Sequence, residues 1–167
     1  MSNLYVQKIT GLAELPQRQT EYSAGMDVRA CLWNKTVKIF TPAGDVVDRE
    51  VVAGTIALYP GERSLIPTGL KMSVDDGYCI KFYPRSGLSL KQGLTLINAV
   101  GVGDQDYSEQ YYVTLTNAGQ KLQTVGDGER VCQLMVERVE PVIVCEVDEL
   151  PIVESNRAGG FGSTGRN

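Results

Sequence analysis

Acidic side chains are the first candidates for acid–base chemistry in this chain, because it contains no histidine. Asp104 and Asp106 alternate in the segment "GVGDQDY", which places both carboxylates on one face if the backbone is extended there. Two neighbouring carboxylates can bind a metal ion or activate a water molecule. An acidic β-turn is the more common structure for an isolated pair of this spacing. The lack of histidine also excludes Ser-His-Asp and Cys-His catalysis.

Two further segments carry groups that suit a phosphate. Arg85, Ser86 and Gly87 directly follow an apolar stretch, and a guanidinium, a hydroxyl and backbone N–H groups at a strand end can bind an anion. The segment "GGFGSTG" at residues 159–165 has the glycine spacing of a phosphate-binding loop, but the chain stops two residues later, with no helix to follow. For Arg85, Ser86 and Gly87 taken alone, a solvated turn is the favoured structure.

Two polar residues lie within apolar strand-like segments. Asp27 in "SAGMDVRA" is expected to satisfy a buried arginine or a backbone turn. Gln133 in "GERVCQLMV" is expected to be a buried amide with specific partners.

Short segments rich in Val, Ile, Tyr and Thr are expected to position these residues as β-strands. Examples are "LYVQKIT", "KTVKIF", "GYCIKFYP", "VCQLMVERV" and "VIVCEV", separated by turn sequences such as "TPAGD" and "GDGE". The segment "RSGLSLKQG" is expected to form one helical turn and little more. This pattern predicts an all-β barrel or sandwich at residues 1–150, followed by a flexible Gly- and Ser-rich arm at residues 151–167.

Composition limits the function classes. The chain has 167 residues, 43% hydrophobic and 22% charged, with a net charge of −4, which is typical of one globular domain. The sequence has no basic stripe of the kind that binds nucleic acid. It also has no apolar run long enough to span a membrane. Four scattered cysteines without metal-binding spacing favour reduced thiols in a cytoplasmic protein.

The order of the polar segments carries more information than any one of them. The segments "AGMDVRA", "PRSGLSLK", "GVGDQDY", "GERVCQL" and "GGFGSTG" resemble, in this order, the five motifs of the trimeric dUTP pyrophosphatase (dUTPase) family. "IPTGL" is also similar. The resemblance implies a distorted jelly-roll or β-barrel subunit in a homotrimer with a swapped C-terminal arm. It also implies Mg²⁺-assisted hydrolysis of dUTP to dUMP and pyrophosphate, which limits uracil in DNA and supplies dUMP for thymidylate synthesis.

The resemblance also assigns roles around the nucleoside. Asp104 corresponds to the general base that activates the attacking water, and Asp106 to a supporting carboxylate. Asn98 would recognise the uracil edge, and Tyr107 would pack on the deoxyribose and exclude a ribose 2′-hydroxyl. Backbone groups of three residues would complete the uracil edge: Val102, Gly103 and Tyr112.

Other matching residues are implied to bind the triphosphate. Arg85, Ser86 and Gly87 would hold the phosphates, Gln133 would reach them from a neighbouring subunit, and Asp27 would be a structural carboxylate nearby. Mg²⁺ would be held by the phosphates and water, without a direct protein ligand. In the arm, Phe161 would stack on uracil. Four other residues of the arm would bind the γ-phosphate: Arg157, Gly162, Ser163 and Thr164.

The sequence departs from the family pattern in four places. The arm arginine usually stands five positions before the phenylalanine, where this chain has Asn156, so Arg157 is expected to replace it. Gly103 stands where a branched aliphatic residue is usual and is expected to loosen the packing behind the uracil pocket. Glu109 stands where glycine is usual. Residues 34–53 are longer than the usual connection and are expected to form an extra hairpin.

Two other functions remain open from the sequence. A dCTP deaminase shares the fold and an Arg-Ser pair, although the Asp104–Tyr107 segment and the Phe161 arm favour a dUTPase. A regulatory or interaction protein built on the same fold would use residues 34–53 as its binding element.

Overall fold

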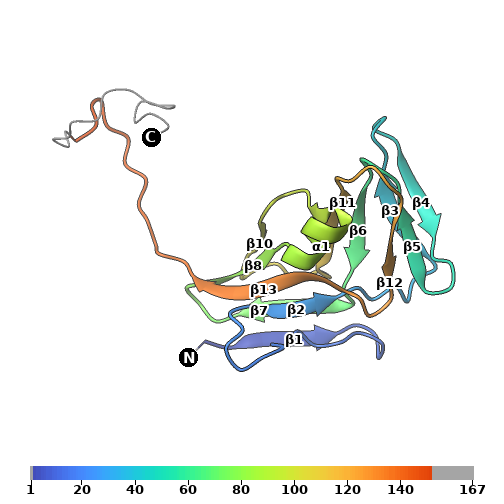
Figure 1. The fold of residues 1–167 in the computed structure, drawn as a ribbon. Coiled ribbons are helices and arrows are strands. Elements are labelled where there is room, and N and C mark those ends of the chain that lie inside the picture. Colours follow the sequence, from blue (N-terminus) through green and yellow to red (C-terminus); the bar gives the residue numbers. More distant parts are fainter. Residues whose placement is uncertain (1, 152–167) are drawn as a thin grey trace.

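The computed structural model describes residues 2–151, which consist mainly of β-strands (Figure 1). The strands are β1 (Leu4–Lys8), β2 (Met26–Arg29), β3 (Thr36–Phe40), β4 (Val46–Glu50), β5 (Thr55–Leu58), β6 (Arg63–Pro67), β7 (Leu70–Val74), β8 (Tyr78–Tyr83), β9 (Leu94–Leu96), β10 (Gly101–Gly103), β11 (Tyr112–Asn117), β12 (Gln123–Gly126) and β13 (Arg130–Arg138). One helix, α1 (Ser86–Gln92), lies in this range. The expected all-β fold is confirmed.

The strands form four antiparallel groups. Their orders are β10-β8-β13-β2, β4-β3-β6-β11-β9, β1-β7 and β12-β5. Figure 1 shows β3, β4, β5 and β12 gathered at one end of the molecule, away from β1 and β7. Large aliphatic side chains from most of these strands are fully buried in one shared core: Ile39, Ile56, Leu58, Ile66, Leu70, Ile80, Leu94, Leu115 and Leu134.

Helix α1 is longer than the sequence suggested, with seven residues instead of a single turn. Leu88 is its buried residue and attaches the helix to the core. Gly93 ends the helix in the left-handed conformation, with φ of 69°, and its N–H caps the carbonyls of Leu88 and Ser89. Glycine adopts this conformation without the steric cost of a Cβ. Burial of one leucine and this cap therefore stabilise a second turn.

Residues 34–53 contain the β3–β4 hairpin. Register pairs run from Thr36 with Glu50 to Phe40 with Val46, and Ile39 also pairs with Ser64 of β6. Val37 and Ile39 alternate with exposed residues and are buried, which joins the hairpin to the core. That this hairpin is an addition relative to the family stays a prediction.

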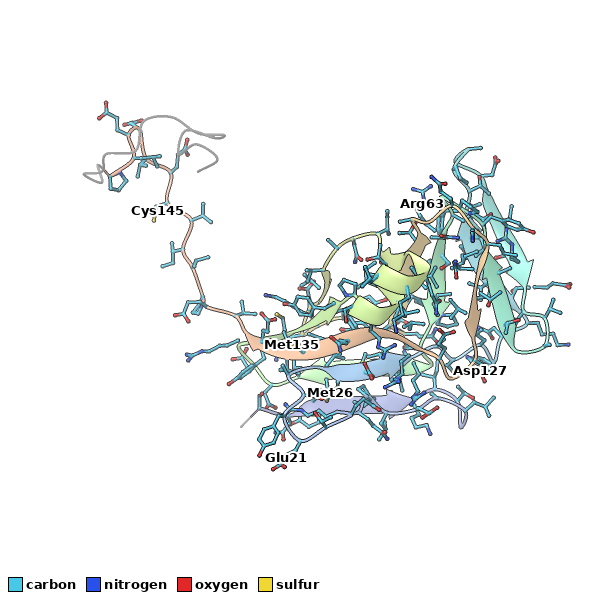
Figure 2. All side chains as sticks on the ribbon, viewed as in Figure 1. Glu21, Met26, Arg63, Asp127, Met135 and Cys145 are labelled. Atoms are coloured by element: carbon cyan, nitrogen blue, oxygen red, sulfur yellow. The ribbon has the colours of Figure 1, made fainter. Side chains whose placement is uncertain are left out.

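The segment after β13 has no strand partner among the described residues, although "VIVCEV" was predicted to be a strand. Val142, Ile143 and Val144 are 80%, 90% and 93% exposed. Figure 1 shows this part of the chain extending away from the body, and Figure 2 shows Cys145 on it. The segment has the composition of a strand, but no strand within residues 2–151 pairs with it.

Helix α1, the one helix within residues 2–151, is not long and apolar enough to cross a membrane.

Candidate active site

A cavity of about 340 Å³ lies beside β10 and the start of β11. Four predicted site residues with polar groups line it: Asn98, Asp104, Tyr107 and Tyr112. The rest of its wall is mainly apolar, from Leu65, Phe82, Gly101, Val102, Tyr111 and Thr114. Pockets of this kind, apolar with a few convergent polar groups, are typical of small-molecule sites.

Asp104 follows β10 directly and is exposed at this cavity. The backbone turns after it, because the N–H of Tyr107 donates to the carbonyl of Asp104 at 3.2 Å. The backbone is therefore not extended here: the acidic β-turn, the more common structure for this spacing, is the one found, and the condition for placing Asp104 and Asp106 on one face is not met. Asp106 instead lines a second cavity of about 460 Å³, together with Tyr5 and Lys71.

Asn98 has a fixed amide group. The Thr114 hydroxyl and the Asn98 Oδ1 atom are 2.7 Å apart, so the hydroxyl can donate to this oxygen, and both residues line the cavity. The Asn98 Nδ2 atom lies close to Gly101: a Cβ added to that glycine would be 3.3 Å from Nδ2. Thr114 was not identified from the sequence, because a threonine in a strand carries no distinguishing pattern.

Two tyrosines form one wall of the cavity. Tyr107 donates its hydroxyl to the carbonyl of Gln110 at 3.1 Å, and its ring meets the Tyr111 ring edge-on, with centroids 4.8 Å apart. Burial, with smaller contributions from Tyr107 and Asp104, raises the pKa of Tyr111 to about 12, so its hydroxyl stays protonated at neutral pH.

Gly103 packs tightly against the same wall. A Cβ at this position would lie 2.6 Å from the hydroxyl oxygen of Tyr111 and 2.7 Å from its ring. Distances below 3.0 Å require something to move. The expectation that Gly103 loosens the packing is therefore wrong, because the Tyr111 ring occupies the volume that a branched side chain would take.

A second group of predicted residues centres on Asp27. Its side chain is only 5% exposed and accepts hydrogen bonds from two arginines. Arg85 Nε donates to Oδ1 at 3.1 Å, and Arg130 Nη1 donates to Oδ2 at 3.0 Å. The prediction that Asp27 satisfies an arginine is confirmed. Arg130 was not singled out from the sequence, although it stands inside the "GERVCQL" segment.

The arginines in this group have fixed positions. Arg85 Nη1 also donates to the carbonyl of Arg130 at 3.0 Å, so the Arg85 guanidinium is held at two of its nitrogens. Two guanidiniums on one carboxylate leave a net positive charge at this point, which favours an anion. Ser86 and Gly87 follow Arg85 in the first turn of α1, and both are exposed.

Gln133 belongs to the same region but is not buried as expected. It pairs in register with Asp27 on one side and Tyr83 on the other. Its neighbours Cys132 and Leu134 are buried, whereas Gln133 is exposed. Gln133 therefore lies on the outer face of the strand, beside Asp27 and its arginines.

Five predicted site residues lie outside the described residues: Arg157, Phe161, Gly162, Ser163 and Thr164. The described residues thus form two groups, a cavity with Asp104 at its edge and a charged group around Asp27. The first suits a base and sugar with a carboxylate close by, and the second suits phosphates.

Comparison with known proteins identifies the family. The dUTPase family matches residues 51–165, which include four of the five motifs. The chain belongs to the dUTPase family. Deoxyuridine 5′-triphosphate nucleotidohydrolase of Finegoldia magna is 38% identical to it over 151 residues, covering 90% of this chain and 91% of that protein. The enzyme of the same name from Bdellovibrio bacteriovorus is 40% identical over 156 residues, covering 92% and 89%.

Solved structures share the fold of this dUTPase family member. The Staphylococcus bacteriophage 80alpha dUTPase with dUPNHPP superimposes with a TM-score of 0.77, at 22% identity, covering 98% of both chains.

Proposed function

We propose that this protein hydrolyses dUTP to dUMP and pyrophosphate. The observation that carries the proposal is the 340 Å³ cavity, where Asn98, Tyr107 and Asp104 meet. An amide can recognise the uracil edge, an aromatic ring can pack on the sugar, and a carboxylate at the rim can act on a water molecule. Relatives at 38% and 40% identity over about nine-tenths of the chain carry the corresponding name.

Asp104 acts as the general base in this proposal. Its carboxylate accepts a proton from a water molecule as the water oxygen attacks the α-phosphorus. The bond from that phosphorus to the α–β bridging oxygen breaks, and pyrophosphate leaves. Arg85 and the first turn of α1, with Ser86 and Gly87, hold the phosphates in line for this displacement.

Mg²⁺ enters as part of the substrate, bound to the triphosphate oxygens and water, which are its usual ligands. Within residues 2–151, no three side chains of Asp, Glu, Cys or His gather into a metal site. The ion would neutralise charge on the phosphates, while the protein supplies Asp104 and Arg85.

The proposed assembly is a homotrimer with an exchanged C-terminal arm. Val142, Ile143 and Val144 support it, because three successive β-branched residues that are at least 80% exposed are typical of a strand that pairs with another copy. Such an assembly would bring Gln133 of one subunit and the arm of another to each site.

The arm, residues 151–167, closes over the bound nucleotide in this proposal. Phe161 stacks on uracil, and Gly162, Ser163 and Thr164 donate to the γ-phosphate. Arg157 supplies the γ-phosphate charge. Deleting residues 156–167 should therefore leave a folded trimer with sharply reduced hydrolysis. Arg157→Ala should cost much of what this deletion costs, and Asn156→Ala little.

The proposed setting is the cytoplasm, where the reaction limits uracil in DNA and supplies dUMP. All four cysteines lie within the described residues and are free, as is usual for proteins of a reducing compartment.

Product analysis after incubation with dUTP and Mg²⁺ tests the proposal. We expect dUMP and pyrophosphate from the wild-type protein, and no turnover but retained nucleotide binding from Asp104→Asn, which removes the base without emptying the cavity. Near-normal hydrolysis by Asp104→Asn would contradict the assignment of the base. Ammonia release from dCTP would instead identify a deaminase.

A further inference from the structure

Tyr111 is attached to the core both by its backbone and by its ring. Its N–H donates to the carbonyl of Leu70 at 2.9 Å, and its carbonyl accepts the buried Thr68 hydroxyl at 2.7 Å. Its ring also packs on Phe82, with centroids 5.3 Å apart. Backbone and ring are thus both fixed to the core.

Thr68 belongs to the "IPTGL" segment, which has no role in the chemistry described above. Its neighbour Gly69 has φ of 69°, and a Cβ there would lie 2.8 Å from Ala13. The turn at Thr68 and Gly69 is therefore closely confined, and through its hydrogen bonds it sets the position of Tyr111.

Tyr107, in contrast, lies on an exposed turn. Its hydroxyl bonds to the carbonyl of Gln110 within the same turn. The backbone of the turn is also held to β7, because the Ser73 hydroxyl donates to the carbonyl of Gln105 at 3.2 Å. The edge-on contact with Tyr111, at 4.8 Å and 69° between ring planes, links the Tyr107 ring to the anchored part of the structure.

We infer that Tyr111 is the positioning residue for Tyr107 and thereby sets the discrimination of this enzyme between deoxyribose and ribose. The inference rests on the proposed function, in which the Tyr107 ring packs on the sugar and leaves no space for a 2′-hydroxyl. Gly103 is the matching half of the arrangement, because only a residue without a Cβ leaves space for the Tyr111 ring.

The aromatic ring, and not the hydroxyl, carries this role. The Tyr111 hydroxyl is buried and has no hydrogen-bond partner within residues 2–151. The contacts that position Tyr107 are those of the ring. Phenylalanine would keep these contacts, whereas valine would remove the edge on which Tyr107 rests.

The kinetic test compares kcat/KM for dUTP and for UTP in the full-length wild type, Tyr111→Phe and Tyr111→Val. Tyr111→Phe should keep a dUTP-to-UTP ratio close to that of the wild type. Tyr111→Val should lower the ratio roughly tenfold, the order of discrimination that steric fit in a pocket provides. Leu58→Ala is the matched control, because Leu58 is fully buried on β5 and does not line the cavity. It should lower stability without changing the ratio.

Each outcome of this test has a distinct meaning. A wild type that is selective for dUTP and a Tyr111→Val variant that is equally selective would overturn the inference. An equal loss in Tyr111→Phe and Tyr111→Val would also overturn it, because the hydroxyl would then be responsible. A wild type that does not hydrolyse dUTP would instead refute the proposed function.

A second measurement tests the packing without any substrate. Gly103→Ala should lower the urea midpoint of unfolding in the wild type, and by a smaller amount in Tyr111→Val, where the ring that it would meet is gone. Equal shifts in the two backgrounds would contradict the interlocking of Gly103 and Tyr111.

Discussion

Replacing Asp27 with asparagine tests the charged group most directly. The substitution keeps the size of the side chain but removes its charge, and one carboxylate oxygen becomes an NH₂ group that cannot accept a hydrogen bond. One of the two arginine bonds, at 3.1 Å and 3.0 Å, is therefore lost. The other keeps its charged guanidinium donor but loses the charge on its acceptor.

The magnitude follows from the burial of the three side chains. A hydrogen bond to a charged group contributes about 1.5–3 kcal/mol, and breaking a fully buried ion pair costs about 3–5 kcal/mol. Asp27 is 5% exposed, but Arg85 and Arg130 are 23% and 37% exposed and can recover some hydration. We therefore expect Asp27→Asn to lower the free energy of unfolding by about 2–3 kcal/mol.

The assay is urea unfolding at a fixed protein concentration, since the stability of the proposed trimer would depend on that concentration. Asp48→Asn is the control, because Asp48 pairs with Lys38 at 3.6 Å but is 64% exposed, and its loss should change stability by ~0.5 kcal/mol or less. Asp27→Asn should also raise KM for dUTP, because one of the two contacts that hold the Arg85 guanidinium is weakened or lost. Equal stability changes in the two variants would refute the argument, and so would an unchanged KM.

Three further predictions concern the rest of the fold. Hydrogen bonds from Arg49 hold the pKa of Glu62 in the folded protein below its usual value. The ionised Glu62 therefore stabilises the fold above about pH 4.3, the pKa of a free glutamate, and this stabilisation is lost as the pH falls through the lower pKa of the folded state. The stability difference between wild type and Glu62→Gln should accordingly shrink on acidification, and a constant difference would contradict this. Asn117→Ala should cost about 3 kcal/mol in urea unfolding, because the fully buried amide bonds Leu58, Lys121 and Gly119; a cost near zero would be inconsistent with those bonds. Burial raises the pKa of the Cys132 thiol, so iodoacetamide should label it in urea but not in the native protein, as mass spectrometry of peptides would show.

Local sequence patterns were sufficient for the fold class and for part of the site. Alternating β-branched and polar residues predict strands because the strand period of two depends only on neighbouring residues, and β3 shows it clearly. A lone carboxylate among apolar residues predicts a cationic partner, because an unpaired buried charge is costly, and Asp27 has two. The second turn of α1 was missed because it depends on burial of Leu88.

Contacts between distant residues were decided only by the tertiary structure. The identity of the partners of Asp27 required the fold, since Arg85 and Arg130 lie 58 and 103 positions away in the sequence. Alternation likewise does not say which face of a strand is covered, and Gln133 proved to be on the exposed one. Gly103 shows the limit most clearly. The departure from the family pattern at this position indicated looser packing, whereas the Tyr111 ring, held by the turn at Thr68, fills that space. Close packing depends on which side chains the fold brings together.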